Sequence, residues 1–137
     1  MRDLSFKEIS KRINDFDLPY FELVVGIAEG GIVPASLIAQ KLGVDLKIIK
    51  ISYRDNQNKP VYNEPVILSR ENISDKKILL VDDVSVSGKT LETAIKILQG
   101  NSITTLTFKG KADYVLFPEI GECVNWPWKL QSQEQII

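Results

Sequence analysis

Residues 77–90 read KILLVDDVSVSGKT, and this stretch carries most of the information about the architecture of the chain. Residues 77–81, which are apolar after Lys77, predict a buried strand, and two carboxylates, Asp82 and Asp83, follow it directly. Small polar residues then predict a turn, and apolar residues at helical spacing predict a helix over residues 87–99. This order places the first backbone N–H groups of the helix near both carboxylates.

The turn after the acidic pair has the composition of an anion-binding site. Unpaired N–H groups and the dipole at the start of a helix attract anions. Ser85, Ser87 and Thr90 add hydroxyl donors, and Gly88 allows the backbone to approach a ligand closely. Carboxylates next to such a turn suit a ligand that carries both an anionic group and sugar hydroxyls. Mg²⁺ would balance the two negative charges.

Three other interpretations fit parts of this stretch. The stretch ends in Gly88, Lys89 and Thr90, which are also the last residues of a nucleotide-binding P-loop motif. That motif, however, needs a glycine at the position of Asp83. Phosphoacceptor receiver domains also have an acidic pair after a strand, but there it follows the first strand, near the N-terminus. The third interpretation is an ordinary helix N-cap after a core strand, with solvated carboxylates. The stretch alone leaves this third interpretation open.

Strands and helices alternate along most of the chain. Ser5 and Glu8 form a capping box, and apolar residues at helical spacing from Phe6 to Phe16 predict a first helix. A second helix is predicted over residues 32–42, and residues 54–64 are predicted to be a polar loop. Strands are predicted over residues 22–28, 46–53, 65–68, 77–81, 103–108 and 114–117.

This alternation predicts an α/β fold in a single domain, residues 1–137, with a mostly parallel central sheet covered by helices on both faces. In such folds, ligands bind beyond the carboxyl ends of the strands, where the strand order reverses. The loops after Ala28, Tyr53, Val81 and Phe108 are therefore the expected binding loops.

The composition excludes several kinds of chemistry. The 137 residues include no histidine and one cysteine, Cys123. Histidine-based catalysis, histidine metal ligands, an internal disulfide and a thiolate zinc site are therefore excluded. The net charge of −1 predicts no nucleic-acid surface. No apolar run reaches the ~18 residues of a membrane span, and the N-terminus lacks a signal-peptide core. We expect a cytoplasmic protein without nucleic-acid or membrane partners.

Four segments resemble type I phosphoribosyltransferases, in the family order, over about residues 20–130. Residues 77–90 resemble the family's signature for phosphoribosyl pyrophosphate (PRPP). Residues 26–35 (GIAEGGIVPA) resemble its pyrophosphate loop, and Ser52 with Tyr53 resembles the start of its flexible catalytic loop. Residues 113–128 (DYVLFPEIGECVNWPW) resemble the base-binding tail of the short xanthine-guanine type. In this fold the tail forms a small hood over the base.

The resemblance implies that a ring nitrogen of a purine-like base displaces pyrophosphate from PRPP, with Mg²⁺ as cofactor. Asp82 and Asp83 are the expected catalytic residues, which bind the ribose and the metal. The other expected contacts are Ser85, Val86, Ser87, Gly88, Lys89 and Thr90 for the 5′-phosphate, Glu29, Gly30 and Gly31 for pyrophosphate, and Lys109, Cys123 and Val124 for the base. Lys111 is an alternative to Lys109. A homo-oligomer, a dimer or tetramer, is also expected.

Three residues depart from the family pattern. Val86 stands where the xanthine-guanine type has an acid/base aspartate, Glu29 replaces a basic residue of the pyrophosphate loop, and Cys123 replaces a base-stacking aromatic. An enzyme is the first hypothesis. Because of these departures, the second is a non-catalytic regulator that binds PRPP or a nucleotide. Trp126 and Trp128 are expected to pack in the core or in an interface.

Overall fold

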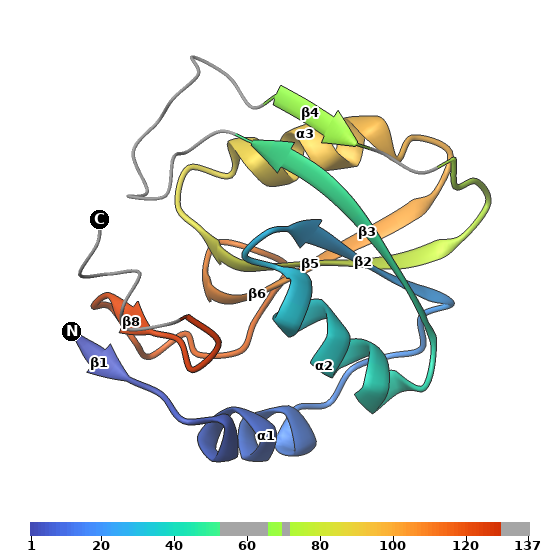
Figure 1. Ribbon diagram of the computed structural model, residues 1–137. Helices are drawn as coiled ribbons and strands as arrows, with labels where there is room; N and C mark the ends of the chain where they lie inside the picture. Colours follow the sequence, from blue (N-terminus) through green and yellow to red (C-terminus); the bar gives the residue numbers. More distant parts are fainter. Residues whose placement is uncertain (53–65, 70–71, 130–137) are drawn as a thin grey trace.

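The computed structural model describes residues 1–52, 66–69 and 72–129 (Figure 1). The helices in this part of the chain are α1 (Phe6–Asp15), α2 (Ile32–Leu42) and α3 (Lys89–Ile97). The strands are β1 (Arg2–Asp3), β2 (Leu23–Ala28), β3 (Asp45–Ser52), β4 (Val66–Ser69), β5 (Lys77–Ser85), β6 (Ser102–Gly110), β7 (Tyr114–Val115) and β8 (Val124–Asn125).

The main sheet has the strand order β4-β3-β2-β5-β6-β7. All neighbouring pairs are parallel except β3 with β4, which is antiparallel. Helices α1 and α2 cover one face of the sheet and α3 covers the other (Figure 1), so the predicted α/β fold is confirmed. The strand order reverses between β2 and β5, because the chain runs from β2 to β3 on one side and later enters β5 on the other. The carboxyl ends of β2 and β5 are therefore the position at which a ligand site is expected.

The core has two layers because consecutive strand residues point to opposite faces of the sheet. All six residues of β2 are buried. Val24 packs in the cluster that includes Ile38 of α2, whereas Val25 packs in the cluster that includes Leu91 of α3. A strand buried on both faces must be apolar at every position, which is why β2 reads as an unbroken apolar run.

Helix α1 begins and docks through polar contacts. The predicted capping box is present: Glu8 N–H donates to Ser5 Oγ at 3.1 Å, and Ser5 N–H donates to Glu8 Oε1 at 3.3 Å. Arg12 of α1 donates to Glu119 Oε2 at 2.6 Å and to the carbonyl of Leu116 at 2.6 Å. The hydrogen bond from Arg12 lowers the pKa of Glu119 to about 2. These contacts tie α1 to the chain that follows β7.

The predicted end of the central strand was wrong. Strand β5 does not stop at Val81 but continues through the acidic pair to Ser85, because Asp82, Val84 and Ser85 remain paired with Thr107, Lys109 and Gly110 of β6. The predicted strand over residues 103–108 extends to Gly110 for the same reason. The acidic pair is therefore held by a strand ladder. Tyr53 and the predicted loop over residues 54–64 lie outside the described residues.

The two ends of the described chain meet in a second, two-stranded sheet. Strands β1 and β8 pair in parallel, with Arg2 opposite Val124 and Asp3 opposite Asn125. The indole rings of Trp126 and Trp128 then stack with centroids 5.1 Å apart and planes 8° apart, and both rings contact Phe108. The two tryptophans were expected to pack in the core or in an interface; Trp126 is buried in the core, and Trp128 packs against the core half-buried. This sheet and the tryptophans after it form the hood. Within residues 1–52, 66–69 and 72–129, no helix has the length and apolar character needed to cross a membrane.

Candidate active site

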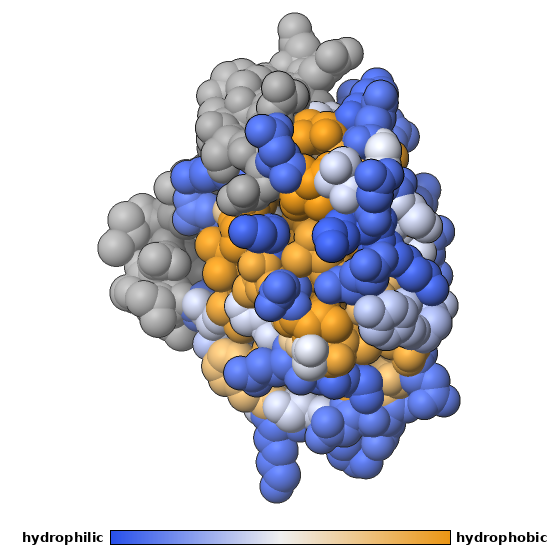
Figure 2. Space-filling model, turned by 90° about the vertical axis from the view of Figure 1, so that its right-hand side faces the viewer, coloured by the Kyte–Doolittle hydropathy of each residue, from blue (hydrophilic) through white to orange (hydrophobic). Residues whose placement is uncertain are grey.

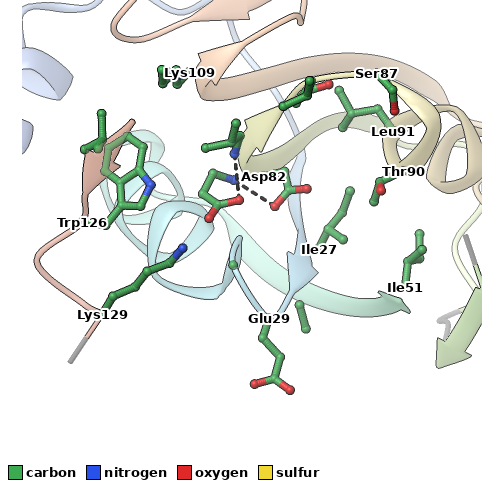
Figure 3. Close-up of a pocket in the computed structure, with 18 of the residues that line it drawn as sticks. Ile27, Glu29, Ile51, Asp82, Ser87, Thr90, Leu91, Lys109, Trp126 and Lys129 are labelled. Carbon is green, nitrogen blue, oxygen red and sulfur yellow. Dashed lines mark hydrogen bonds between the residues drawn. The ribbon is translucent and has the colours of Figure 1, made fainter. Parts of the chain in front are cut away.

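A cleft of about 580 Å³ opens at the carboxyl ends of β2 and β5, where the strand order reverses (Figure 3). The hood borders it on one side and the start of α3 on the other. The residues singled out from the sequence that line this cleft are Glu29, Gly30, Asp82, Asp83, Ser85, Val86, Ser87, Gly88, Thr90, Lys109, Cys123 and Val124. Segments separated by almost one hundred residues thus converge on one cavity.

The acidic pair is at the centre of the cleft. Asp82 is 8% exposed and Asp83 is half-buried. Asp83 N–H donates to Asp82 Oδ1 at 2.9 Å, and Val84 N–H donates to Asp83 Oδ1 at 2.7 Å (dashed in Figure 3). Burial raises the pKa of Asp82 well above its usual range, and the neighbouring charge of Asp83 raises it further, while Lys129 opposes the shift. The fold therefore holds a carboxyl group where its ionised form is disfavoured.

We expect Asp82→Asn to stabilise the ligand-free protein at neutral pH. The folded state keeps the Asp82 proton at pH values at which the unfolded chain has lost it, so this group makes stability fall as pH rises from about 4 through the raised pKa. Asparagine does not ionise and can still accept the Asp83 N–H. Each unit by which folding raises the pKa of Asp82 corresponds to about 1.4 kcal/mol in the free energy of unfolding, or roughly 3–6 °C in melting temperature.

Thermal denaturation of both proteins between pH 4 and pH 8 measures this effect. The difference in melting temperature should grow with pH. Asp83→Asn is the matched control, since its carboxyl group is only half-buried and should give a smaller gain. An Asp82→Asn variant that melts below the wild type at pH 8 would contradict the conclusion that burial disfavours the ionised form of Asp82.

The turn after β5 has the geometry of an anion site. Gly88 has a φ of +85°, caps α3 without a side-chain hydrogen bond, and leads into the helix at Lys89. The Oγ of Ser85 is buried and has no hydrogen-bond partner among the described residues, although Ser85 lines the cleft. A buried hydroxyl of this kind needs a partner, which a ligand oxygen can provide. Lys89 does not line the cleft.

The loop after β2 lies directly against the acidic pair. The peptide bond between Ala28 and Glu29 is cis. A Cβ atom on Gly30 would lie 2.6 Å from Asp83 Oδ2, so only glycine allows this approach. Gly31 is buried beneath the loop and does not line the cleft, and its N–H donates to the carbonyl of Ile27 at 2.8 Å.

The charge of Glu29 is compensated by a residue that the sequence did not single out. Lys50 Nζ lies 3.2 Å from Glu29 Oε1, and the strand register places Lys50 beside Ala28. Lys50 also lines the cleft, as do Trp126 and Lys129, which were likewise not assigned to the site. Strand β3 carries two lysines, Lys47 and Lys50, and no local pattern indicated which of them lies at the cleft. No local pattern indicated Lys129.

The hood side of the cleft presents backbone groups. Arg2 N–H donates to the carbonyl of Cys123 and Leu4 N–H to that of Asn125. Because peptide groups alternate along a strand, the N–H and carbonyl of Val124 point away from β1. Lys109 lies half-buried at the end of β6, and Cys123 is exposed. Lys111, the alternative to Lys109, does not line the cleft.

The two residues expected at the start of the flexible loop fall at the edge of the described chain. Ser52 is the last residue of β3, and Tyr53 lies outside the described residues.

The metal ligands expected in the cleft are the two carboxyl groups of the acidic pair. Among the described residues, no group of three or more carboxylate, cysteine or histidine side chains could hold a metal by itself. Asp82 and Asp83 offer two adjacent carboxyl groups, which suits Mg²⁺ that keeps water and ligand phosphates as its other ligands.

Known proteins provide an independent comparison. The model of the family described as "Phosphoribosyl transferase domain" matches residues 3–120. The chain is 36% identical over 90 residues to an orotate phosphoribosyltransferase of Sulfurisphaera tokodaii, covering 66% of this chain and 43% of that protein. It is 31% identical over 104 residues to the transcriptional regulator GfcR of Archaeoglobus fulgidus, covering 74% and 48%.

The chain therefore spans less than half the length of these two relatives. Among solved structures, a purine phosphoribosyltransferase from Pyrococcus horikoshii has a TM-score of 0.72 with 24% identity, and the match covers 93% of each chain. At this level of identity the likeness concerns the fold.

Proposed function

The chain belongs to the type I phosphoribosyltransferase family, and we propose that it transfers a phosphoribosyl group from PRPP to a purine-like base and releases pyrophosphate. One observation carries the proposal: the acidic pair of β5 lines one cleft together with the turn over residues 85–90, which is the proposed anion-binding turn, and with Cys123 and Val124 of the hood. A ribose ring over the acidic pair would have its 5′-phosphate at the turn and its C1 toward the hood.

The proposed chemistry follows from this arrangement. Displacement at C1 proceeds through a transition state in which the ribose ring gains positive charge. Asp82 and Asp83 would bind the ribose hydroxyls and stabilise that charge electrostatically. Mg²⁺, held by these two carboxyl groups, would neutralise charge on the leaving diphosphate.

The remaining roles are assigned by position. Ser85, Val86, Ser87, Gly88 and Thr90 would bind the 5′-phosphate, with the backbone N–H of Lys89 at the helix start. Glu29 and Gly30 would lie at the diphosphate. The peptide groups of Val124 would read the edge of the base, and Lys109 would contact its exocyclic oxygen. Cys123 would lie beside the base without stacking on it.

A second candidate function is a non-catalytic regulator that binds PRPP or a nucleotide. Val86 favours it, because this residue lines the cleft and its side chain cannot accept a proton. The similarity to a transcriptional regulator also favours it, although the chain covers only 48% of that protein. Both functions use the same PRPP site and differ in turnover.

Calorimetric titration with PRPP tests what the two functions share. We expect Mg²⁺-dependent binding, because the acidic pair and the anion-binding turn are both present. Absence of binding by PRPP and by nucleoside monophosphates at millimolar concentration would contradict both functions. A screen of purines and pyrimidines with PRPP and Mg²⁺ then separates them: transfer to any base supports the enzyme, and normal PRPP binding without transfer supports the regulator.

The cellular context is also part of the proposal. We propose a cytoplasmic protein, where PRPP and free bases are available, that assembles as a dimer or tetramer. Figure 2 shows a face on which apolar side chains form a central band between hydrophilic ones. Exposed apolar surface of this kind is common at subunit contacts and supports the assembly.

A further inference from the structure

We propose that Lys129 is the cation that binds the diphosphate of PRPP, in place of the basic residue that the loop after β2 lacks. This inference rests on the proposed function and adds a binding residue to it. The expected pyrophosphate loop contributes a carboxylate, Glu29, where an anion should bind. An anion at this position needs a positive charge from another part of the chain.

Three lysines line the cleft among the described residues, and their positions differ. Lys50 lies within 3.2 Å of the Glu29 carboxylate, so the charges of this pair offset each other. Lys109 stands at the end of β6, on the hood side. Lys129 is the one whose ammonium points at the acidic pair (Figure 3).

The hood fixes the position of Lys129. Its N–H donates to the carbonyl of Trp126 at 3.1 Å, so a tight turn joins it to a residue that is 3% exposed. Trp126 is held by its stack with Trp128 and by Phe108. The backbone N–H of Lys129 is thus tied to the hood.

The side of the cleft on which Lys129 lies indicates its ligand. In Figure 3, Lys129 and Glu29 lie on one side of Asp82, and Ser87 and Thr90 of the anion-binding turn lie on the other. No carboxylate of the described residues lies within ion-pair distance of the Lys129 ammonium. Its positive charge nevertheless opposes the rise in the pKa of Asp82 that burial causes. A ligand with one anionic group at the turn and another across the acidic pair would bring the second group to Lys129. PRPP has this arrangement, whereas ribose 5-phosphate lacks the second group.

Calorimetry with PRPP, inorganic pyrophosphate and ribose 5-phosphate tests the assignment on the full chain. Lys129→Ala should weaken PRPP and pyrophosphate binding about tenfold, the effect of losing one charge-assisted contact at an exposed site. Binding of ribose 5-phosphate should change less than about twofold. Lys129→Arg should restore most of the PRPP affinity. Lys111→Ala is the matched control, because Lys111 is exposed and lies outside the cleft.

Each outcome decides a different point. Equal weakening of PRPP and ribose 5-phosphate by Lys129→Ala would mean that Lys129 only balances the charge of Asp82, and would overturn the assignment. Unchanged PRPP binding would overturn it as well. If the wild type binds ribose 5-phosphate and PRPP in either case, the proposed PRPP site is retained and only the assignment of Lys129 fails. If the wild type binds neither, the proposed function fails and the assignment fails with it.

Discussion

The double variant Asp82→Asn with Asp83→Asn is expected to fold and to lose phosphoribosyl transfer, by at least about 10³-fold in kcat. Both carboxyl groups would lie at the ribose ring as it gains positive charge, and removal of such electrostatic stabilisation costs several kcal/mol of barrier. Neither change disturbs the ladder between β5 and β6, because that ladder is formed by backbone groups. Steady-state kinetics with PRPP and the base accepted by the wild type measures the loss.

The stability of the variant separates a functional from a structural effect. Burial disfavours ionised Asp82, so the double variant should melt at or above the temperature of the wild type at neutral pH. Inactivity combined with a raised melting temperature would show that these carboxyl groups serve ligand chemistry. Retention of more than a tenth of the wild-type kcat would contradict the catalytic role proposed for the pair.

Val86→Asp is expected to raise kcat/KM with a 6-oxopurine by up to about 10²-fold, the range contributed by a positioned acid or base. Val86 is 62% exposed and lines the cleft directly after β5, so an aspartate there adds a carboxylate to the lining of the cleft without disturbing the core. Its backbone N–H remains available to the 5′-phosphate. The new charge lies near Asp82 and Asp83, which will offset part of the gain by weakening PRPP binding.

Val86→Asn is the matched control, because asparagine has nearly the shape of aspartate but does not exchange protons. Guanine, xanthine and hypoxanthine should each be tested with both variants. If Val86→Asp folds, binds PRPP and still gives an unchanged or lower kcat/KM with all three bases, proton transfer does not limit the reaction. The natural acceptor would then be another base, or the chain would act as a regulator.

The sequence predicted the centre of the fold because local patterns specify it. The apolar run of residues 77–81 and the acidic pair after it indicated a buried strand that carries the site, and both are present. The end of that strand was not predictable from side-chain polarity. Asp82 and Ser85 are polar, yet their backbone groups pair with β6, and the ladder does not depend on which side chain is attached.

The resemblance of residues 113–128 predicted a hood, but no local pattern predicted its pairing with β1, because these contacts join distant parts of the chain. The hydrogen bond from Asn125 Nδ2 to Asp3 Oδ1 spans 122 positions, and the strands that it joins have two residues each. Strands this short have no detectable periodicity. The position of Lys129 follows from that pairing and from the stacked tryptophans, so it could be found only in the folded structure.

The pairing of β1 with β8 also bears on the order in which the protein becomes functional as it is made. The main sheet is complete in sequence once residue 115 has been synthesised, whereas the hood needs Val124 and the tryptophans that follow. During synthesis, strand β1 has no partner strand until more than one hundred further residues, up to β8, have been made. The acidic pair and the turn after β5 can thus form before the hood side of the cleft exists. In the function proposed above, the ability to select a base would be the last property that the growing chain acquires.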